Sequence, residues 1–384
     1  MTSVVVAGAL ANKPHNGGEA WVRLSWLLGL ERLGLRPWFV EEMTPAAAVD
    51  ADGAPAPLEA SVNVAWFESV TERFGFADRA ALVGPGGERL RGPEADGLRD
   101  VLRDADLLVN VSGNLRAPEL LRLPASRAYV DLDPAYTQLW HAGGLLEGAL
   151  ERHEHLLTVA LSIGRPSCRL PPAGRPWRPV PPPVVLDEWP TMDVPEQRVV
   201  TTVASWRGGF GRVEHEGRLL GQKAHEFRRF ADLPRRASAQ FEAALEIHPG
   251  DDRDRRLLQD GGWRLVDPRV AAGSPDAFRR YVQRSAAEFS PAQGAYVETA
   301  CGWFSDRTTR YLATGRPALV QDTGLPPGIP VGEGLLAFRG MRDAVLGVRS
   351  IASDYDRHRV GARRIAEQHF ASDVVLRGLL ADVL

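Results

Sequence analysis

The chain has 384 residues, of which 44% are hydrophobic and 25% are charged. This composition is typical of globular proteins and excludes disorder, collagen-like sequence and coiled coil as the main class. At about 100 to 200 residues per domain, the length predicts two or three domains. The 46 basic and 49 acidic residues are interspersed and leave a net charge of -3, so we expect no nucleic-acid partner.

The two cysteines and the apolar runs indicate a cytoplasmic protein. Cys168 and Cys301 cannot form a disulfide framework or a four-cysteine zinc site, which favours reduced thiols. The longest apolar runs are well below the roughly 18 residues that a bilayer crossing needs, so we expect no integral membrane segment. Residues 4–11 are apolar, but no basic residue precedes them, and they predict a buried strand better than a secretory signal.

The first half of the chain alternates between strand and helix patterns. A strand is expected at residues 3–9, followed by a turn and a helix at 19–33 with Gly34 at its C-cap. The pattern continues with a strand at 37–40, a surface loop at 45–57, helices at 62–74 and 98–103, and strands at 106–111 and 128–131. This alternation predicts a parallel sheet with helices on both faces.

Residues 165–195 are too rich in proline for a helix or an inner strand, and we place the domain boundary there. The first domain is predicted to span residues 1–186, ending in this linker, and the second to span 187–384. After the linker, strands are expected at 199–203, 241–247, 263–266, 288–290 and 318–321, with helices at 224–230, 253–259, 275–286 and 305–314 and a helical tail at 344–384.

The fold class predicted is therefore α/β, with two Rossmann-like, doubly wound domains facing a central cleft. Open parallel sheets bind ligands at the carboxyl ends of their strands, so chemistry is expected in the loops that follow strands. The loop after the first strand contains His15 and ends in Gly17 and Gly18, where a helix begins. It is either a site for a phosphate or sugar edge or an ordinary tight turn, and without GxGxxG it disfavours a dinucleotide.

The segment around residues 302–317 carries a short helix with clear ends. Ser305 is a good N-cap and Gly315 stands at the C-cap. Asp306 suits the positive end of the helix dipole, whereas Arg307 is disfavoured there unless an anion lies nearby. Either a bound diphosphate or an ion pair of Arg307 with Asp306 or Asp322 would resolve this conflict.

The second half of the chain resembles the nucleotide-sugar-binding domain of GT-B glycosyltransferases. Residues 302–320 read GWFSDRTTRYLATGRPALV, which matches their glycine turn, short helix and apolar strand; QDTG at 321–324 and GEGLL at 332–336 match the turns that follow. The GWFSDR form also resembles a bacterial subgroup of glycosyltransferase-like proteins. The resemblance implies an acceptor domain at 1–186 and a donor domain at 187–384.

The same resemblance implies which residues bind the donor. They are Gly17, Gly18, Arg207, Lys223, His225, Gly302, Ser305, Asp306 and Arg307. Lys223 has separate support, because 44 of the 46 basic residues are arginine and a surviving lysine indicates a site that suits a compact ammonium. The chain departs from the family at Gly302 and Arg310, where retaining members commonly have two glutamates.

An inverting transfer needs a base for the acceptor hydroxyl, and Asp133 is the first candidate. It ends a strand before a proline, with Asp131 on the same side, and a second carboxylate nearby raises a pKa. His15 is the rival base. The alternative interpretation of Asp133 is an Asx-turn or a helix N-cap.

The resemblance implies a hexosyltransferase that moves a sugar from a nucleoside-diphosphate donor to a small-molecule or oligosaccharide acceptor. A nucleotide-sugar epimerase or hydrolase on the same fold, and a catalytically silent nucleotide- or sugar-binding protein, are the alternatives. No cofactor is expected. His153 and His155 form an HxH triplet without a third ligand at fixed spacing, so we expect no metal site.

Overall fold

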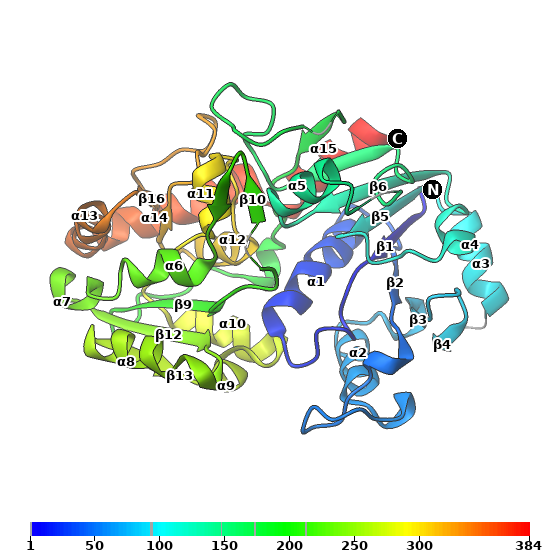
Figure 1. Ribbon diagram of the computed structural model, residues 1–384, viewed down its shortest axis with the longest axis horizontal. Helices are drawn as coiled ribbons and strands as arrows, with labels where there is room; N and C mark the ends of the chain where they lie inside the picture. The colour runs from blue at the N-terminus through cyan, green and yellow to red at the C-terminus, as the bar shows by residue number, and fades with distance from the viewer. Residues whose placement is uncertain (1, 93–94, 147, 173, 212) are drawn as a thin grey trace.

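The computed structural model describes residues 2–92, 95–146, 148–172, 174–211 and 213–384. The chain forms two α/β units that lie side by side, one built around each of two large sheets (Figure 1). The structure thus has two Rossmann-like, doubly wound domains, as the sequence predicts. No helix in the described ranges is both long and apolar enough to cross a bilayer.

The first sheet has eight described strands in the order β4-β3-β2-β1-β5-β6-β7-β8. From β1 the chain adds β2, β3 and β4 on one side. It then returns to place β5 on the other side of β1 and continues outward through β6, β7 and β8, so the switch point lies between β1 and β5. All neighbours are parallel except β3 and β4. The strands are β1 Val4–Ala7, β2 Trp38–Glu42, β3 Ala80–Val83, β4 Arg89–Arg91, β5 Leu107–Val111, β6 Ser126–Asp131, β7 His155–Thr158 and β8 Trp177–Pro179.

The helix that follows β1 belongs to the first domain and packs against the second. Asn16 caps α1 by accepting a hydrogen bond from the Glu19 N–H, and the helix is buried over most of its length. On α1, the Trp21 indole donates to the Pro275 carbonyl at 2.9 Å. The helices of the first domain are α1 Gly17–Arg32, α2 Val62–Arg73, α3 Ala95–Arg103, α4 Pro118–Leu121 and α5 Tyr136–Ala142.

The second sheet has six described strands, all parallel, in the order β13-β12-β9-β14-β15-β16. Its switch point lies between β9 and β14. The strands are β9 Val199–Ser205, β12 Gln240–Glu246, β13 Trp263–Val266, β14 Ala287–Ser290, β15 Ala318–Gln321 and β16 Leu335–Phe338. A separate hairpin, β10 Val213–His215 with β11 Arg218–Leu220, follows β9.

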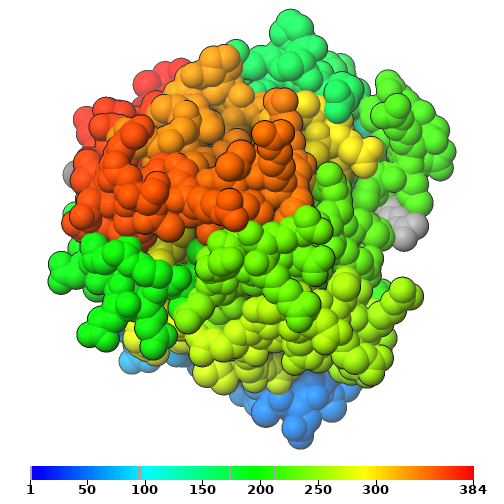
Figure 2. All heavy atoms as spheres, turned by 90° about the vertical axis from the view of Figure 1, so that its left-hand side faces the viewer, coloured from blue at the N-terminus to red at the C-terminus, as the bar shows by residue number. Residues whose placement is uncertain are grey.

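An aromatic core supports the second sheet. Phe289 of β14 stacks on Phe338 with ring centroids 4.9 Å apart, and Phe230 packs edge-on against both. The face turned away from the first domain carries α13 and α14, orange in Figure 2. The helices of this domain are α6 Lys223–Arg228, α7 Leu233–Ala237, α8 Asp252–Asp260, α9 Pro268–Ala272, α10 Pro275–Arg284, α11 Gly294–Thr299, α12 Asp306–Ala313, α13 Met341–Ser353 and α14 Tyr355–Ile365.

The end of the chain returns to the first domain. After a π-helical turn at Ala366–Phe370, helix α15 Ser372–Val383 packs along α1. A Cβ placed at Gly29 of α1 would lie 2.6 Å from Cδ1 of Leu376, so a glycine permits this close packing. The proposed division at residue 186 stays a prediction, and the tail contacts both units.

Candidate functional site

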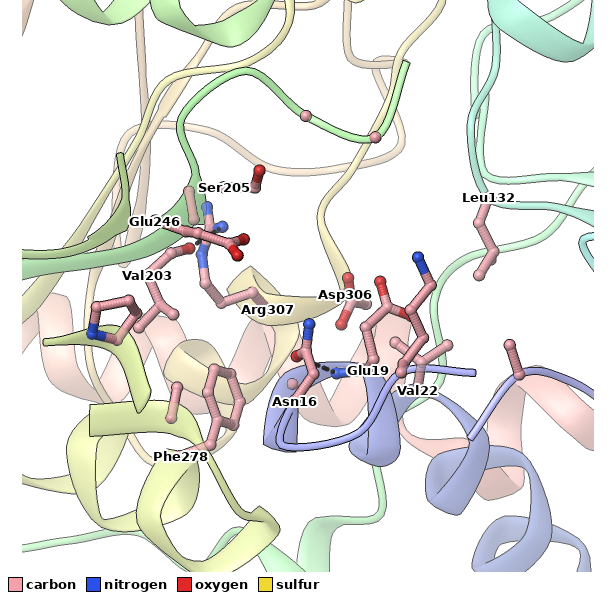
Figure 3. Close-up of a pocket in the computed structure, with 18 of the residues that line it drawn as sticks. Asn16, Glu19, Val22, Leu132, Val203, Ser205, Glu246, Phe278, Asp306 and Arg307 are labelled. Carbon is pink, nitrogen blue, oxygen red and sulfur yellow. Dashed lines mark hydrogen bonds between the residues drawn. The ribbon is translucent and has the colours of Figure 1, made fainter. Parts of the chain in front are cut away.

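A cavity of about 1040 Å³ lies between the two domains. It is lined by the loops that follow β1 and β6 in the first domain and β9, β12, β13 and β14 in the second. In Figure 3, Asn16 and Glu19 of α1 lie together with Asp306 in the middle of the view, and Glu246 and Arg307 lie to their left. The cavity therefore lies where the carboxyl ends of two parallel sheets meet.

The loop after β1 is held in place by a buried carboxylate that the sequence analysis did not single out. Glu41 of β2 accepts hydrogen bonds from the backbone N–H groups of Leu10, Ala11 and Asn12 at 2.6 to 2.8 Å. Burial raises the pKa of Glu41 to about 7. The Asn63 amide donates to the Ala11 carbonyl at 2.8 Å, so this edge of the cavity is fixed from two elements.

The glycine loop divides its residues between the cavity and the domain interface. Gly18 and the exposed His15 line the cavity. Gly17 is buried against the second domain, where an added Cβ would lie 2.1 Å from the Ser274 carbonyl oxygen. The packing gives Gly17 an interface role, while the predicted donor contacts of Gly17 and Gly18 and the catalytic role of His15 stay predictions.

Asp131 and Asp133 have different surroundings. Asp131 is buried and accepts hydrogen bonds from the side chains of Thr137, Gln138 and Thr158 at 2.6 to 2.8 Å and from the Asp133 N–H at 3.0 Å. The Asx-turn that the sequence offered as an alternative is therefore made by Asp131. The side chain of Asp133 is left to face the cavity.

Asp133 has the electrostatic character of a general base. Burial, followed by the charges of Asp131 and Glu19, raises the pKa of Asp133 to about 7. The Tyr296 hydroxyl donates to Asp133 Oδ1 at 3.2 Å and Lys13 lies close enough to act on its charge, and both favour the carboxylate. A base with a pKa near the working pH is the most effective kind.

Helix α6 brings Lys223 to the opposite wall of the cavity. The nearby carboxylates Glu288 and Asp306 pair with arginines on α12, and Lys223 forms no ion pair with any described carboxylate. Burial and then the Arg307 charge lower the pKa of Lys223 to about 7. His225, also predicted to bind the donor, accepts the Gln222 N–H through Nδ1 at 3.1 Å and does not line the cavity.

Arg207 lies outside the cavity in this structure. Its exposed guanidinium binds Asp251 through Nε at 2.9 Å and through a second nitrogen at 2.5 Å. Its neighbours Gly208, Gly209 and Phe210 do line the cavity. The predicted contact of Arg207 with the donor stays a prediction, and the structure gives this side chain a different partner.

The first turn of α12 places Asp306 and Arg307 on the cavity wall, with Ser305 buried at the N-cap. Arg307 donates to Glu288 Oε1 at 2.5 Å, to the Val203 carbonyl at 2.7 Å and to the Ser290 hydroxyl at 2.7 Å. The ion pair of Arg307 with Asp306 or Asp322, one of the two alternatives that the sequence leaves open, is not formed among the described residues. The buried Glu288 of β14 is the partner, because β14 lies directly under the helix.

The neighbouring Asp306 and Asp322 have partners of their own. Asp306 pairs with Arg310 one turn further along α12, and Asp322 pairs with Arg339 at 2.8 Å. Gly302 lies just before this helix with φ of 74°, and an added Cβ would lie 2.7 Å from the Ser162 nitrogen of the first domain. Gly302 therefore allows the two domains to pack closely against each other at this point, and Trp303 beside it lines the cavity.

A charged cluster at the cavity floor escaped the sequence analysis. Arg310 is fully buried, and it reaches from α12 to the Ser25 hydroxyl of α1 at 3.4 Å. Arg23 of α1 is also buried and pairs with Glu19. The contact of Arg310 with Ser25 joins residues 285 positions apart, so local spacing does not predict it, whereas Glu19 and Arg23 stand one helical turn apart.

The HxH triplet gives His153 a structural position. His153 is buried, with Nε2 3.1 Å from the Asn110 amide nitrogen and Nδ1 3.0 Å from the Ala149 carbonyl oxygen. Burial lowers the pKa of His153 to about 4. Within the described ranges, no group of three or more His, Cys, Asp or Glu side chains could hold a metal ion.

No protein-family model matches the chain, and no curated protein does. Among solved structures, an alpha-glucosyltransferase in complex with UDP has a TM-score of 0.59 at 12% identity, covering 100% of this chain and 99% of that one. HepE of Anabaena in complex with UDP gives 0.56 at 10% identity, with 100% and 99% coverage. A sucrose-phosphate synthase from Thermosynechococcus elongatus gives 0.53 at 11%, with 100% and 98%.

At these identities the similarity shows the fold. The chain has the GT-B fold, in which two Rossmann-like domains enclose a cleft, and it shares this fold along its whole length with glycosyltransferases. The cavity of this protein lies in that cleft.

Proposed function

We propose that the protein is a glycosyltransferase that moves a sugar from a nucleoside-diphosphate sugar to a small-molecule or oligosaccharide acceptor. One observation carries the proposal: two cationic side chains of the second domain, Lys223 and Arg307, line the same cavity as Asp133 of the first. The charge of Asp133 also acts on Lys223. A diphosphate leaving group and a base for an incoming hydroxyl need these groups in one cavity.

The donor side of the proposal rests on the unpaired lysine. When protonated, Lys223 offers three N–H donors and has no carboxylate partner among the described residues, whereas Arg307 is anchored by Glu288 and Ser290 and presents its charge from a fixed position. Negative charge develops on the diphosphate as the sugar leaves. Cations already held in place stabilise that charge without reorganising.

The acceptor side rests on Asp133. With its pKa near 7, a large share of Asp133 is ionised at neutral pH and can take a proton from an acceptor hydroxyl. The resulting alkoxide would attack the sugar carbon as the bond to the diphosphate breaks, and the proton stays on Asp133. This is an inverting route, and it makes no use of the glutamate pair that Gly302 and Arg310 replace.

The finer parts of the proposal come from the sequence. The transferred sugar is a hexose, the enzyme works in the cytoplasm, and the GWFSDR segment groups it with the bacterial subgroup that it resembles. Free Cys168 and Cys301 are compatible with a reducing compartment. The reaction as proposed needs no metal.

A thermal-shift screen with UDP, dTDP and GDP tests donor binding. A ligand at about a hundred times its dissociation constant adds roughly 2.7 kcal/mol to the free energy of unfolding. In a chain of this length, that increase raises Tm by about 2 to 4 °C. The absence of a shift with all three would contradict the proposal. Donor turnover that requires an acceptor then separates transfer from hydrolysis and epimerisation, and binding without any turnover identifies a silent binding protein.

A further inference from the structure

We propose that Tyr296 is a positioning residue that holds Asp133 as a carboxylate, and that the base is completed only by contact between the two domains. The inference rests on the proposed function. Asp133 belongs to the loop after β6 of the first domain, and Tyr296 to α11 of the second. Their hydrogen bond, 3.2 Å from Tyr296 Oη to Asp133 Oδ1, crosses the cleft.

The bond is the last link of a chain of side chains. The Tyr136 hydroxyl of α5 donates to Gln293 Oε1 at 2.8 Å, and Gln293 Nε2 donates to Tyr296 Oη at 3.2 Å. The Tyr296 hydroxyl then donates to Asp133. All three donors point the same way, so each bond polarises the next and the chain ends on the carboxylate.

Packing fixes the tyrosine at the end of this chain. Tyr296 is 2% exposed, and its ring stacks on Trp303 with centroids 4.7 Å apart and planes 28° from parallel. Its ring also packs edge-on against Tyr136. Burial holds the pKa of Tyr296 well above its ordinary value, so the hydroxyl keeps its proton and acts only as a donor.

The surroundings of Asp133 explain why this donor matters. Asp131 beside it and Glu19 of α1 both oppose a negative charge on Asp133. Lys13 of the first loop and Lys223 of α6 favour that charge, but neither forms a hydrogen bond to Asp133 among the described residues. Tyr296 is thus the side chain that donates to the ionised form, and it uses Oδ1. Asp133 Oδ2 is left for the acceptor.

The test measures the protonation of Asp133 without relying on activity. Urea unfolding is followed from pH 5 to 9 for two pairs: wild type with Asp133→Asn, and Tyr296→Phe with the double variant. In each pair, the free energy of unfolding of the protein that keeps Asp133 falls, relative to that of its Asp133→Asn counterpart, as the pH rises toward the pKa of Asp133 in the folded state. Above that pKa the difference between the two proteins becomes constant. We expect Tyr296→Phe to move this upper break about one pH unit higher.

Tyr136→Phe is the matched control, because it removes a hydroxyl two bonds further along the chain and should move the break by less than about 0.3 unit. An equal break in the wild-type and Tyr296→Phe pairs overturns the proposal. If Tyr296→Phe is too unstable to titrate, Gln293→Leu gives the second measure. It weakens Tyr296 as a donor and should raise the break by about 0.3 to 0.5 unit, and no change there also overturns the proposal.

Kinetics add a readout that a structural role would not move. The acid limb of the pH profile of kcat/KM should shift upward with the titration, so that Tyr296→Phe loses about 3- to 10-fold at pH 6 and less than about 2-fold at pH 9. If the stability titration shifts while no glycosyl transfer is found, the inference about Asp133 stands and the proposed function fails. If glycosyl transfer is found but neither the stability titration nor the kinetic pH profile shifts, the proposed function stands and the inference about Tyr296 fails.

Discussion

Lys223 on α6 and Arg307 on α12 present like charges to the same cavity, and within the described part of the chain Arg307 has a carboxylate partner while Lys223 has none. Burial, with the charge of Arg307 next in importance, lowers the pKa of Lys223 to about 7. An anion bound between them would relieve the repulsion and restore the lysine's proton. An anion-binding role for the pair would therefore show itself as a pH-dependent affinity.

Replacing this lysine should weaken nucleotide binding. We expect Lys223→Ala to cost about 1.5 to 3 kcal/mol in the binding of a nucleoside diphosphate, because a charged hydrogen bond is lost. Stability of the fold should change little, since Lys223 pairs with no described carboxylate. Calorimetric titration measures the loss, and Arg207→Ala is the matched control.

The control separates two residues that the sequence placed in the same role. Arg207 is exposed and bound to Asp251, so its replacement should change the affinity by less than about twofold. Equal losses in the two variants would show that Arg207 turns into the cavity when a nucleotide binds. An unchanged affinity in Lys223→Ala would remove Lys223 from the site.

Donor binding should depend on pH through the same lysine. Binding of a diphosphate favours the protonated form, so the affinity should be constant below about pH 6 and fall as the pH rises above 7. The fall approaches tenfold per pH unit until the pKa of the bound state is reached. A nucleotide sugar is the ligand to use, because its diphosphate does not itself titrate between pH 5 and 9. In Lys223→Arg, whose guanidinium stays charged, the part of this fall that comes from the lysine should be lost.

Asp133→Asn should separate catalysis from binding. It keeps the size of the side chain and an acceptor for the Tyr296 hydroxyl but removes the base, so the transfer rate should fall about 100-fold or more. Donor affinity should change by less than about threefold. Steady-state kinetics and calorimetry measure the two effects.

Two further variants locate the base if Asp133 is not it. Asp131→Asn should lower the rate less, and it should destabilise the fold by about 1 to 3 kcal/mol, because an amide cannot accept all the hydrogen bonds that Asp131 receives. A normal rate in Asp133→Asn together with an inactive His15→Ala would assign the base to the glycine loop. Normal rates in both would mean either that another residue activates the acceptor or that the reaction is retaining and uses no such base.

The two glycines at the start of α1 should differ sharply in their tolerance of a methyl group. Gly17→Ala would bring a Cβ within 2.1 Å of the Ser274 carbonyl oxygen, and we expect a loss of about 1 to 3 kcal/mol. The nearest atoms to a Cβ at Gly18 lie 3.6 Å away, which is ordinary contact, so Gly18→Ala should be close to neutral. Chemical unfolding measures both, and equal losses would show that the backbone of this loop, not the interface, sets the requirement.

Most of the sheet architecture could be predicted from the sequence because its long strands are apolar runs that precede helical patterns. The strands that escaped prediction are short or atypical. β3 Ala80–Val83 begins with two alanines, and β8 Trp177–Pro179 contains a proline, which an edge strand tolerates and an inner strand does not. The proline-rich segment was correctly excluded as an inner strand, but its edge pairing with β7 depends on contacts that only the folded sheet creates.

The candidate site could be predicted where it follows a strand and not where it depends on distant partners. Asp133 is predicted from its position after a strand, and Lys223 from the resemblance and from the scarcity of lysine in the chain; both line the cavity. Tyr296 also lies beyond a predicted strand, so a closer search of that loop could have found it. Arg310 could not be found, because its burial and its contact with Ser25 arise only when the two domains meet.

Helix α15 gives the order of synthesis a structural meaning. Leu376 and Leu379 belong to the same apolar core as Trp21 and Trp26 of α1, although some 350 residues separate them. While the ribosome is extending the chain, the first sheet can assemble, but the apolar groove along α1 stays open to water until residues 372–383 have emerged. Until then, a nascent first domain exposes this apolar face of α1, and chaperones would be expected to bind it there.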